Sequence, residues 1–161
     1  MTTRDCAAGD LDAMLAVIND AAVAYRGVIP ADCWREPYMS REELEHEIGA
    51  GVRFHGAFDD RELVAVMGLQ DVQDVALVRH AYTRTSAQRR GVGAMLLQAL
   101  LARTDRRVLI GTWAAATWAI RFYERHGFRV VEADRKDALL RRYWRIPQRQ
   151  IASSIVLENR A

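Results

Sequence analysis

A glycine loop is the segment of this sequence best suited to bind a charged ligand. The loop reads QRRGVGA over residues 88–94, between a β-branched segment that ends near Thr83 and an apolar segment that begins near Gly93. A loop between a strand and a helix directs unpaired backbone N–H groups and the positive end of a helix dipole at one point, where phosphate binds well. Two glycines also let a ligand approach the backbone closely. The pattern predicts a phosphate-binding loop, with a plain connecting loop as the alternative.

Two common nucleotide-binding motifs do not fit this spacing. A Rossmann fingerprint requires a third small residue where Leu96 stands. A Walker loop requires Lys followed by Ser or Thr where Ala94 and Met95 stand. Both assignments are therefore excluded.

Two motifs, in the same order along the chain, resemble those of the GNAT superfamily of N-acetyltransferases. The Gln/Arg-x-x-Gly-x-Gly/Ala phosphate loop of that family is matched by Gln88, Gly91 and Gly93. The Ala-x-x-x-Tyr-x-x-x-Gly-Phe motif is matched by Ala119, Tyr123, Gly127 and Phe128. The order of expected helices and strands agrees with the family from Leu11 to Leu157, so the resemblance covers most of the chain.

The resemblance implies where acetyl-CoA, the cosubstrate, would bind. The loop backbone would hold its pyrophosphate, through Gln88, Arg89, Arg90, Gly91, Val92, Gly93 and Ala94. Tyr82, Thr83 and Arg84 would lie along the pantetheine arm. The sequence departs from the family at Ala116, where many members carry an Asn that helps to hold this arm, and at Thr85 and Ser86, where many carry a Pro. Neither departure removes the phosphate-binding backbone.

Acetyl transfer to an amine requires a neutral amine, a polarised thioester carbonyl and an acid that protonates the departing thiolate. By the resemblance, Tyr123 is the general acid, and its phenol has the O–H donor that the thiolate requires. The alternative is that Tyr123 only packs behind Phe128. A backbone N–H near Tyr82 is the expected carbonyl polariser, which depends on a local bulge in the strand.

The general base is less well defined by the sequence. His80 is the first chemical choice because the unperturbed pKa of imidazole lies near neutrality, but strand alternation leaves its direction open. Asp71, Asp74 and Glu36 are weaker candidates, and a water relay would need none of these residues.

The acceptor site has three competing sequence signals. Trp34, Tyr38, Tyr25 and Trp113 would line an aromatic acceptor pocket or belong to the core. Arg141, Arg142 and Arg145 would receive an anionic substrate or the 3′-phosphate of the cosubstrate. Glu36, Glu42 and Glu43 would instead attract a cation. The sequence does not choose among these signals.

Metal and disulfide chemistry are not expected. His46, His55 and His126 have no clustered partner at metal-ligand spacing. Cys6 and Cys33 are too few for a disulfide framework, so we interpret both as reduced thiols.

The elements that must position these residues follow from hydrophobic periodicity. Helices are predicted over residues 10–24, with Asp10 as N-cap, and 40–50, where Ser40 and Glu43 form a capping box. An irregular aromatic loop, residues 25–39, should help to cover a pocket. Three successive antiparallel strands are predicted over 52–58, 63–69 and 75–83. A helix over 93–103, a strand over 108–113, a helix over 117–126, a strand from 128, a helix over 137–144 and a final strand over 151–157 follow.

This order predicts a single α/β domain over residues 1–161, with a mixed central sheet flanked by helices. A chain of 161 residues with 50% hydrophobic and 27% charged residues has enough interior for a core, and it shows no apolar run of membrane length and no leader. We therefore expect a cytoplasmic protein that does not bind membranes.

The leading hypothesis is an N-acetyltransferase that acts on a small-molecule or peptide amine by direct attack. The alternative is a non-catalytic acyl-CoA-binding regulatory module of the same fold. The arginine-rich segments 84–107 and 135–149 lack an RNA-binding or helix-turn-helix pattern, so no nucleic-acid partner is expected. The sequence does not decide whether the protein forms a homodimer.

Overall fold

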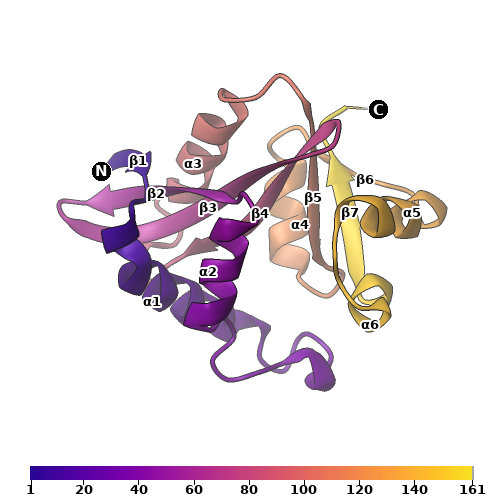
Figure 1. The fold of residues 1–161 in the computed structure, drawn as a ribbon, viewed down its shortest axis with the longest axis horizontal. Helices are drawn as coiled ribbons and strands as arrows, with labels where there is room; N and C mark the ends of the chain where they lie inside the picture. Colours follow the sequence, from indigo (N-terminus) through magenta and orange to yellow (C-terminus); the bar gives the residue numbers. More distant parts are fainter. Residues whose placement is uncertain (161) are drawn as a thin grey trace.

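The computed structural model describes residues 1–160 and folds them around one seven-stranded sheet, with strand order β1-β2-β3-β4-β5-β7-β6 (Figure 1). The strands are β1 (Thr2–Asp5), β2 (Arg53–Asp59), β3 (Glu62–Val72), β4 (Val75–Thr83), β5 (Arg107–Trp113), β6 (Arg129–Val130) and β7 (Ser154–Glu158). The helices are α1 (Leu11–Ala22), α2 (Arg41–Gly49), α3 (Val92–Leu101), α4 (Thr117–Glu124), α5 (Ala133–Tyr143) and α6 (Gln148–Ala152). This mixed sheet with flanking helices confirms the predicted fold class.

The helices cover both faces of the sheet. On one face, α3 and α4 pack on the sheet in a cluster that includes Leu96, Leu97, Tyr123 and Phe128. On the other face, α1 and α2 cover β2 and β3 through Ile18 and Leu44, whereas α5 and α6 cover β5 and β7 through Leu140 and Ile151. Successive residues of β3 and β4 face the two covered sides in turn, which is why residues 63–69 of β3 and 75–78 of β4 are buried without interruption.

The parallel pair at the centre of the sheet opens toward one end. All other neighbouring strands are antiparallel, but β4 and β5 are parallel and pair only over Val75–Val78 and Arg107–Ile110. Beyond this interval the rest of β4, up to Thr83, and the rest of β5, up to Trp113, are not paired with each other. The sheet therefore has an opening between the C-terminal halves of these two strands.

A bulge in β4 lies at the start of this opening. The register with β3 passes from Val66 opposite Tyr82 to Gly68 opposite Arg79, so β4 has one residue more than β3 in this interval. His80, inside the bulge, has a φ of 55°, a left-handed conformation that is uncommon for a residue with a side chain. A bulge leaves an extra residue outside the regular ladder and re-aims side chains, so the local bulge expected near Tyr82 is present.

Several local predictions are confirmed. The three strands β2, β3 and β4 are consecutive and antiparallel. Ser40 caps α2 by accepting a hydrogen bond from the backbone N–H of Glu43, at 3.1 Å. Gly127, with a φ of 88°, ends α4, and the N–H of Phe128 donates to the carbonyl of Tyr123 at 3.1 Å as in a Schellman motif.

Two expectations were wrong, and one strand was not predicted. Asp10 precedes α1 but does not cap it, because its carboxylate accepts from the N–H of Ala7 and from Arg4 instead. Ile151 belongs to α6, so the last strand begins only at Ser154. Strand β1 was not predicted, since an edge strand of polar residues has no apolar alternation to reveal it.

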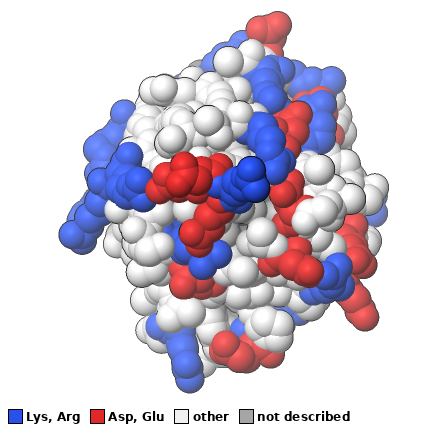
Figure 2. Space-filling model, turned by 90° about the vertical axis from the view of Figure 1, so that its left-hand side faces the viewer, with Lys and Arg blue, Asp and Glu red and all other residues white. Residues whose placement is uncertain are grey.

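None of the helices within residues 1–160 is both long enough and apolar enough to cross a membrane. On the face shown in Figure 2, basic and acidic side chains are interspersed and separated by uncharged surface. That face therefore offers no continuous basic surface to a polyanion.

Candidate active site

The glycine loop borders a cavity of about 480 Å³, which we call the loop cavity. Its walls come from the end of α1, the C-terminal end of β4, the loop and first turn of α3, and one side of α4. Of the residues predicted to contact the cosubstrate, those that line this cavity are Tyr82, Thr83, Gln88, Arg89, Gly91, Val92, Gly93 and Ala94. The sequence thus located most of the lining on the β4 and α3 side.

The first turn of α3 gives the loop cavity its anion-binding character. Gly91 is the N-cap of α3, and the N–H of Met95 donates to its carbonyl at 3.1 Å. The N–H groups before Met95 in this turn have no carbonyl one turn earlier to which they could donate, so they are free for an anion. Gly91 has a φ of 75° and nothing within 4 Å of the position that a Cβ would take. This open, left-handed cradle fits a pyrophosphate group.

At position 93 a glycine is needed for a different structural reason, the packing of α3 against α4. A Cβ at this position would lie 3.3 Å from Cζ of Phe122 on α4. The absence of a side chain therefore lets α3 and α4 pack closely at the edge of the loop cavity.

Two contacts fix the loop to the rest of the molecule. The carboxylate of Asp20 on α1 accepts hydrogen bonds from the backbone N–H and the hydroxyl of Thr85, at 2.7 and 2.9 Å. Arg90 pairs with Asp59 of β2 at 3.0 Å. Thr85 stands where a Pro was expected from the resemblance, and its bonds to Asp20 hold the same segment by another route.

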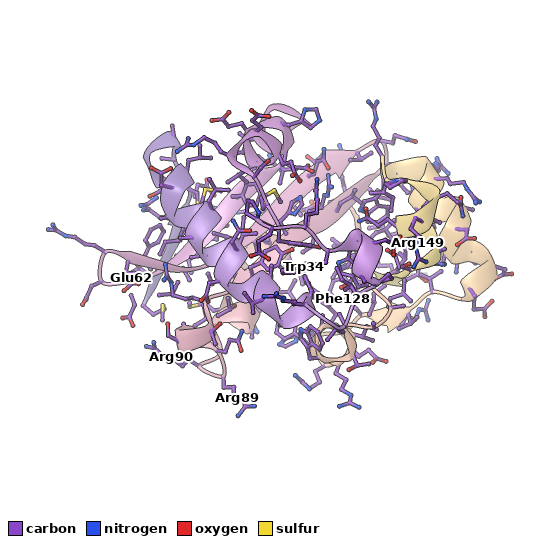
Figure 3. All side chains as sticks on the ribbon, turned by 90° about the horizontal axis from the view of Figure 1, so that it is seen from below. Trp34, Glu62, Arg89, Arg90, Phe128 and Arg149 are labelled. Atoms are coloured by element: carbon purple, nitrogen blue, oxygen red, sulfur yellow. The ribbon has the colours of Figure 1, made fainter. Side chains whose placement is uncertain are left out.

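The predicted contacts Arg84 and Arg90 do not line the loop cavity. Arg90 is held by Asp59, and Arg84 lies 3.7 Å from Glu62. Figure 3 shows Arg89 at the rim of the same loop, extending away from the body of the protein. Arg89 is therefore the loop arginine that is available to a bound anion.

The other wall of the loop cavity was missed at the sequence level. It is formed by α4 and the residues after it, through Trp118, Arg125 and His126. Trp118 is 44% exposed and stacks on Tyr25, with ring centroids 5.9 Å apart. His126 donates from Nδ1 to the carbonyl of Phe122 at 2.7 Å. A Trp five residues before Tyr123 was the available signal, since large exposed aromatic rings often mark binding surfaces.

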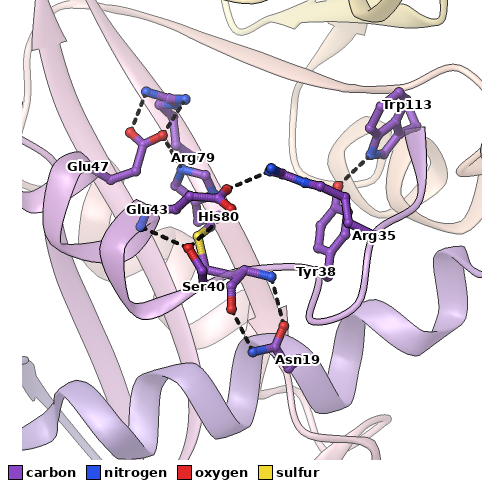
Figure 4. Close-up of polar contacts among 10 residues, drawn as sticks. Asn19, Arg35, Tyr38, Ser40, Glu43, Glu47, Arg79, His80 and Trp113 are labelled. Atoms are coloured by element: carbon purple, nitrogen blue, oxygen red, sulfur yellow. Dashed lines mark hydrogen bonds and ion pairs between the residues drawn. The ribbon is translucent and has the colours of Figure 1, made fainter. Parts of the chain in front are cut away.

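A second, smaller cavity of about 140 Å³ lies at the opening between β4 and β5, and we call it the splay cavity. Its lining includes six aromatic side chains, Tyr25, Tyr38, Tyr82, Trp113, Tyr123 and Trp144. Three of the four aromatics predicted for an acceptor pocket are among them, whereas Trp34 lies behind Tyr38 and stacks on it at 5.6 Å. The indole N–H of Trp113 donates to the hydroxyl of Tyr38 at 2.9 Å (Figure 4).

The two cavities meet at the bulge of β4. Five residues line both of them: Tyr25, Ala81, Tyr82, Ala119 and Tyr123. A ligand in the loop cavity and a ligand in the splay cavity would therefore face each other across these residues, where the sheet is open.

Tyr123 is buried at this junction. Its ring makes edge contacts with Phe122 and Phe128, with centroid separations of 5.1 and 6.0 Å. Burial raises the pKa of Tyr123 well above that of an ordinary phenol. The phenol thus keeps its proton across the physiological range and remains a hydrogen-bond donor.

His80 lines the splay cavity and faces α2. Its Nε2 is buried and lies 3.6 Å from Oε1 of Glu47, and Oε2 of the same carboxylate accepts from Arg79 at 3.0 Å (Figure 4). Burial acts to raise the pKa of Glu47, but His80 and the charge of Arg79 outweigh it, so the pKa of Glu47 is lowered. An ionised carboxylate therefore stands beside the imidazole.

The other proposed bases lie away from both cavities. Asp71 and Asp74 flank the β3–β4 turn, where Asp71 lies 3.5 Å from Arg53 and Asp74 accepts from the hydroxyl of Tyr143 at 2.7 Å. Glu36 accepts from the indole of Trp34 at 3.2 Å. None of the three lines the loop cavity or the splay cavity.

The basic residues of α5 and the segment after it are also remote from the loop cavity. Arg141 donates to Gln148 at 3.0 Å, and Arg142 lies 3.7 Å from Asp74. Arg145, like these two, lies outside the lining of both cavities. The expectation that these arginines receive a 3′-phosphate has no support in this geometry, because α5 covers the opposite face of the sheet from α3 and α4.

Comparison with known proteins bears on the same elements. Residues 15–142 match the family described as the acetyltransferase (GNAT) domain. The chain belongs to the GNAT acetyltransferase family. None of the curated proteins matches the sequence. Membership of the GNAT family gives the general class of chemistry, which is acetyl transfer.

Solved GNAT structures share the whole architecture. The PaiA N-acetyltransferase of Thermoplasma acidophilum, in complex with coenzyme A, is 20% identical with a TM-score of 0.75, over 99% of this chain and 98% of that one. A GNAT family acetyltransferase from Elizabethkingia anophelis with acetyl-CoA bound is 18% identical with a TM-score of 0.66, over 99% and 97%. The ribosomal-protein-alanine N-acetyltransferase of Brucella melitensis is 17% identical with a TM-score of 0.67, over 98% of both chains. These similarities show the fold.

Among residues 1–160, no three His, Cys, Asp or Glu side chains are grouped as metal ligands would be. His55 instead lies buried on β2 with its Nδ1 3.0 Å from Asp5.

Proposed function

We propose that this GNAT protein is an acetyl-CoA-dependent N-acetyltransferase that transfers the acetyl group to a primary amine by direct attack. The observation that carries the proposal is the meeting of the loop cavity and the splay cavity at Tyr123 and the β4 bulge. Acetyl-CoA would occupy the loop cavity, as the coenzyme A and acetyl-CoA complexes of the structural neighbours suggest. The amine would enter from the splay cavity.

The loop cavity supplies what acetyl-CoA requires. The first turn of α3 would hold the pyrophosphate through backbone N–H groups, and Arg89 would add a positive charge at the rim. Tyr82 and Thr83 lead from the loop to the bulge and would follow the pantetheine arm. The thioester would then lie at the junction, beside Tyr123.

Each chemical role has one candidate at the junction. A backbone N–H of the bulge next to Tyr82 would polarise the thioester carbonyl, because the extra residue is free from the regular ladder. Tyr123 would protonate the departing thiolate, and its raised pKa keeps the donor protonated. His80 would accept the proton of the amine, with the carboxylate of Glu47 beside it.

The alternative is a non-catalytic acyl-CoA-binding module. That function would be favoured by a Tyr123 turned away from the bound thioester. Its position in the lining of both cavities supports catalysis instead. Ala116, which stands where many GNAT members have Asn, is fully buried against Ile29 and Trp113 and lines neither cavity, so it would make no contact with an arm bound there.

The test has two measurements. Millimolar acetyl-CoA or coenzyme A should raise the melting temperature, because a ligand that binds only the folded state stabilises it. Free thiol should then appear when acetyl-CoA is mixed with an amine from a panel of small amines and peptides. A melting shift without thiol release from any amine would support the binding module, and the absence of a melting shift would overturn both functions.

A further inference from the structure

The splay cavity has a definite size and chemistry that no comparison assigns to a substrate. Its volume of about 140 Å³ is close to that of a cavity that takes up one benzene molecule, roughly 150 Å³. Tyr25, Tyr38 and Trp113 pack together on one side of the cavity, whereas Trp144, directly after α5, belongs to the cluster that packs under α5 and α6. The space therefore fits one ring between aromatic walls.

The charges at the cavity cancel within the protein. Arg79 is the lining residue with a permanent charge, and it pairs with Glu47 at 3.0 Å and donates to Gln70 at 3.1 Å. No Asp or Glu of residues 1–160 lines the cavity. A second cationic group on the substrate would find no carboxylate, and a substrate carboxylate would compete with Glu47 for Arg79. The cavity thus selects a ligand whose body is uncharged.

Trp144 lines the splay cavity and packs on its β5 side. Its indole lies flat against Gly111 of β5, where a Cβ on the glycine would be 3.1 Å from Cζ2 and 3.4 Å from Nε1 of the indole. Gly111 is the first residue of β5 beyond the paired interval, so the indole covers the strand where the sheet begins to open. A smaller side chain at position 144 would leave the cavity deeper by the size of a ring.

We propose that the splay cavity takes a primary amine carried on a single uncharged aromatic ring, and that Trp144 over Gly111 limits the acceptor to one ring. This rests on the proposed N-acetyltransferase function. The ring would pack between the aromatic walls, where aromatic pairs have favourable edge and offset contacts. The amine would point toward the junction, where His80 and Tyr123 lie.

The experiment compares thiol release from acetyl-CoA with three amines. The probes are 2-phenylethylamine, spermidine and a short peptide with an N-terminal alanine. The ring amine should give the highest kcat/KM, by on the order of tenfold or more, a ratio within reach of differences in pocket contacts. A higher kcat/KM for spermidine or the peptide would overturn the inference and leave the proposed function intact.

A variant pair tests the role of Trp144. Trp144→Ala should raise kcat/KM for 2-(2-naphthyl)ethylamine relative to 2-phenylethylamine, by roughly tenfold. The control is Trp118→Ala, the same substitution in the loop cavity, which should raise the KM for acetyl-CoA without moving this ratio. An unchanged ratio in a folded Trp144→Ala protein would overturn the role of Trp144. Trp144→Phe, which keeps an aromatic ring, provides a second variant if the alanine variant does not fold.

Calorimetric binding of 2-phenylethylamine to the coenzyme A complex separates the two proposals. Binding that Trp144→Ala alters, without turnover of any amine, would support the ring site and overturn the proposed function. If the ring amine is neither bound nor turned over, the ring site itself is overturned.

Discussion

His80 Nε2 lies 3.6 Å from Oε1 of Glu47, across the space between the bulge of β4 and helix α2. The left-handed backbone of His80 turns the imidazole toward this carboxylate, while the residue still lines the splay cavity. Strained backbone of this kind is stable only when the surrounding structure holds it, and it occurs often at functional sites. The pair supports His80 as the acceptor of the amine proton.

The first prediction is that His80→Gln lowers kcat by on the order of 10²-fold, because a positioned base contributes about this much or more. The KM for acetyl-CoA should change little, since His80 does not line the loop cavity. Steady-state rates with the best amine would measure both constants. An unchanged kcat would assign deprotonation of the amine to water.

The second prediction concerns stability at acid pH. The folded-state pKa of Glu47 is lowered below its ordinary value of 4.5, so the unfolded chain binds the proton more readily. The stability that Glu47 contributes is thus present above pH 4.5 and is lost as the pH falls through its lower folded-state pKa. Glu47→Gln should be less stable than the parent at pH 7, and the difference should narrow below pH 4. Chemical denaturation at several pH values measures this, and a constant difference would contradict it.

The sequence located the site on β4 and α3 because backbone geometry there depends on short-range signals. Glycines and the strand-to-helix order identify an anion-binding turn without tertiary information. The positions of Glu47 and Trp144 were not predicted, because each contacts the site through packing of a helix against a distant strand. Ile151 was predicted to begin the last strand, yet it packs into the core from a short helix that follows Pro147.

The third prediction separates loop geometry from ligand binding. Gly91→Val adds a β-branched side chain at a φ of 75° and should destabilise the fold by roughly 1–2 kcal/mol, in addition to weakening coenzyme A binding. Gly91→Asn should cost less stability, because Asn tolerates left-handed backbone, while it still places a side chain over the cradle. Thermal unfolding and coenzyme A titration of both variants measure the two effects. Normal coenzyme A affinity in Gly91→Asn would argue against a phosphate site at this turn.

The fourth prediction concerns the aromatic loop over residues 25–39. Arg149 of α6 pairs with Asp32 of this loop through two contacts of 2.9 and 3.1 Å, and Asn19 holds its far end by bonding both backbone groups of Met39. Tyr38, between these anchors, lines the splay cavity. Asp32→Asn should loosen the loop and raise the KM for the amine several-fold, with little effect on the KM for acetyl-CoA. The double variant Asp32→Arg/Arg149→Asp, which exchanges the two charges, should restore the KM for the amine to that of the parent. Failure of the double variant to do so would exclude the ion pair as the anchor.

The last prediction tests the general acid. Tyr123→Phe keeps the ring between Phe122 and Phe128 and removes only the hydroxyl, so the melting temperature should barely move. The kcat should fall by on the order of 10²-fold, because the thiolate loses its proton donor, while acetyl-CoA affinity should be nearly unchanged. Since burial keeps the phenol protonated, the loss should be equally large at pH 7 and pH 9. His80→Gln is the matched comparison, because it removes the proposed base from the same junction and leaves the acid in place. A kcat for Tyr123→Phe equal to that of the parent would make Tyr123 a packing residue and would assign protonation of the thiolate to another group.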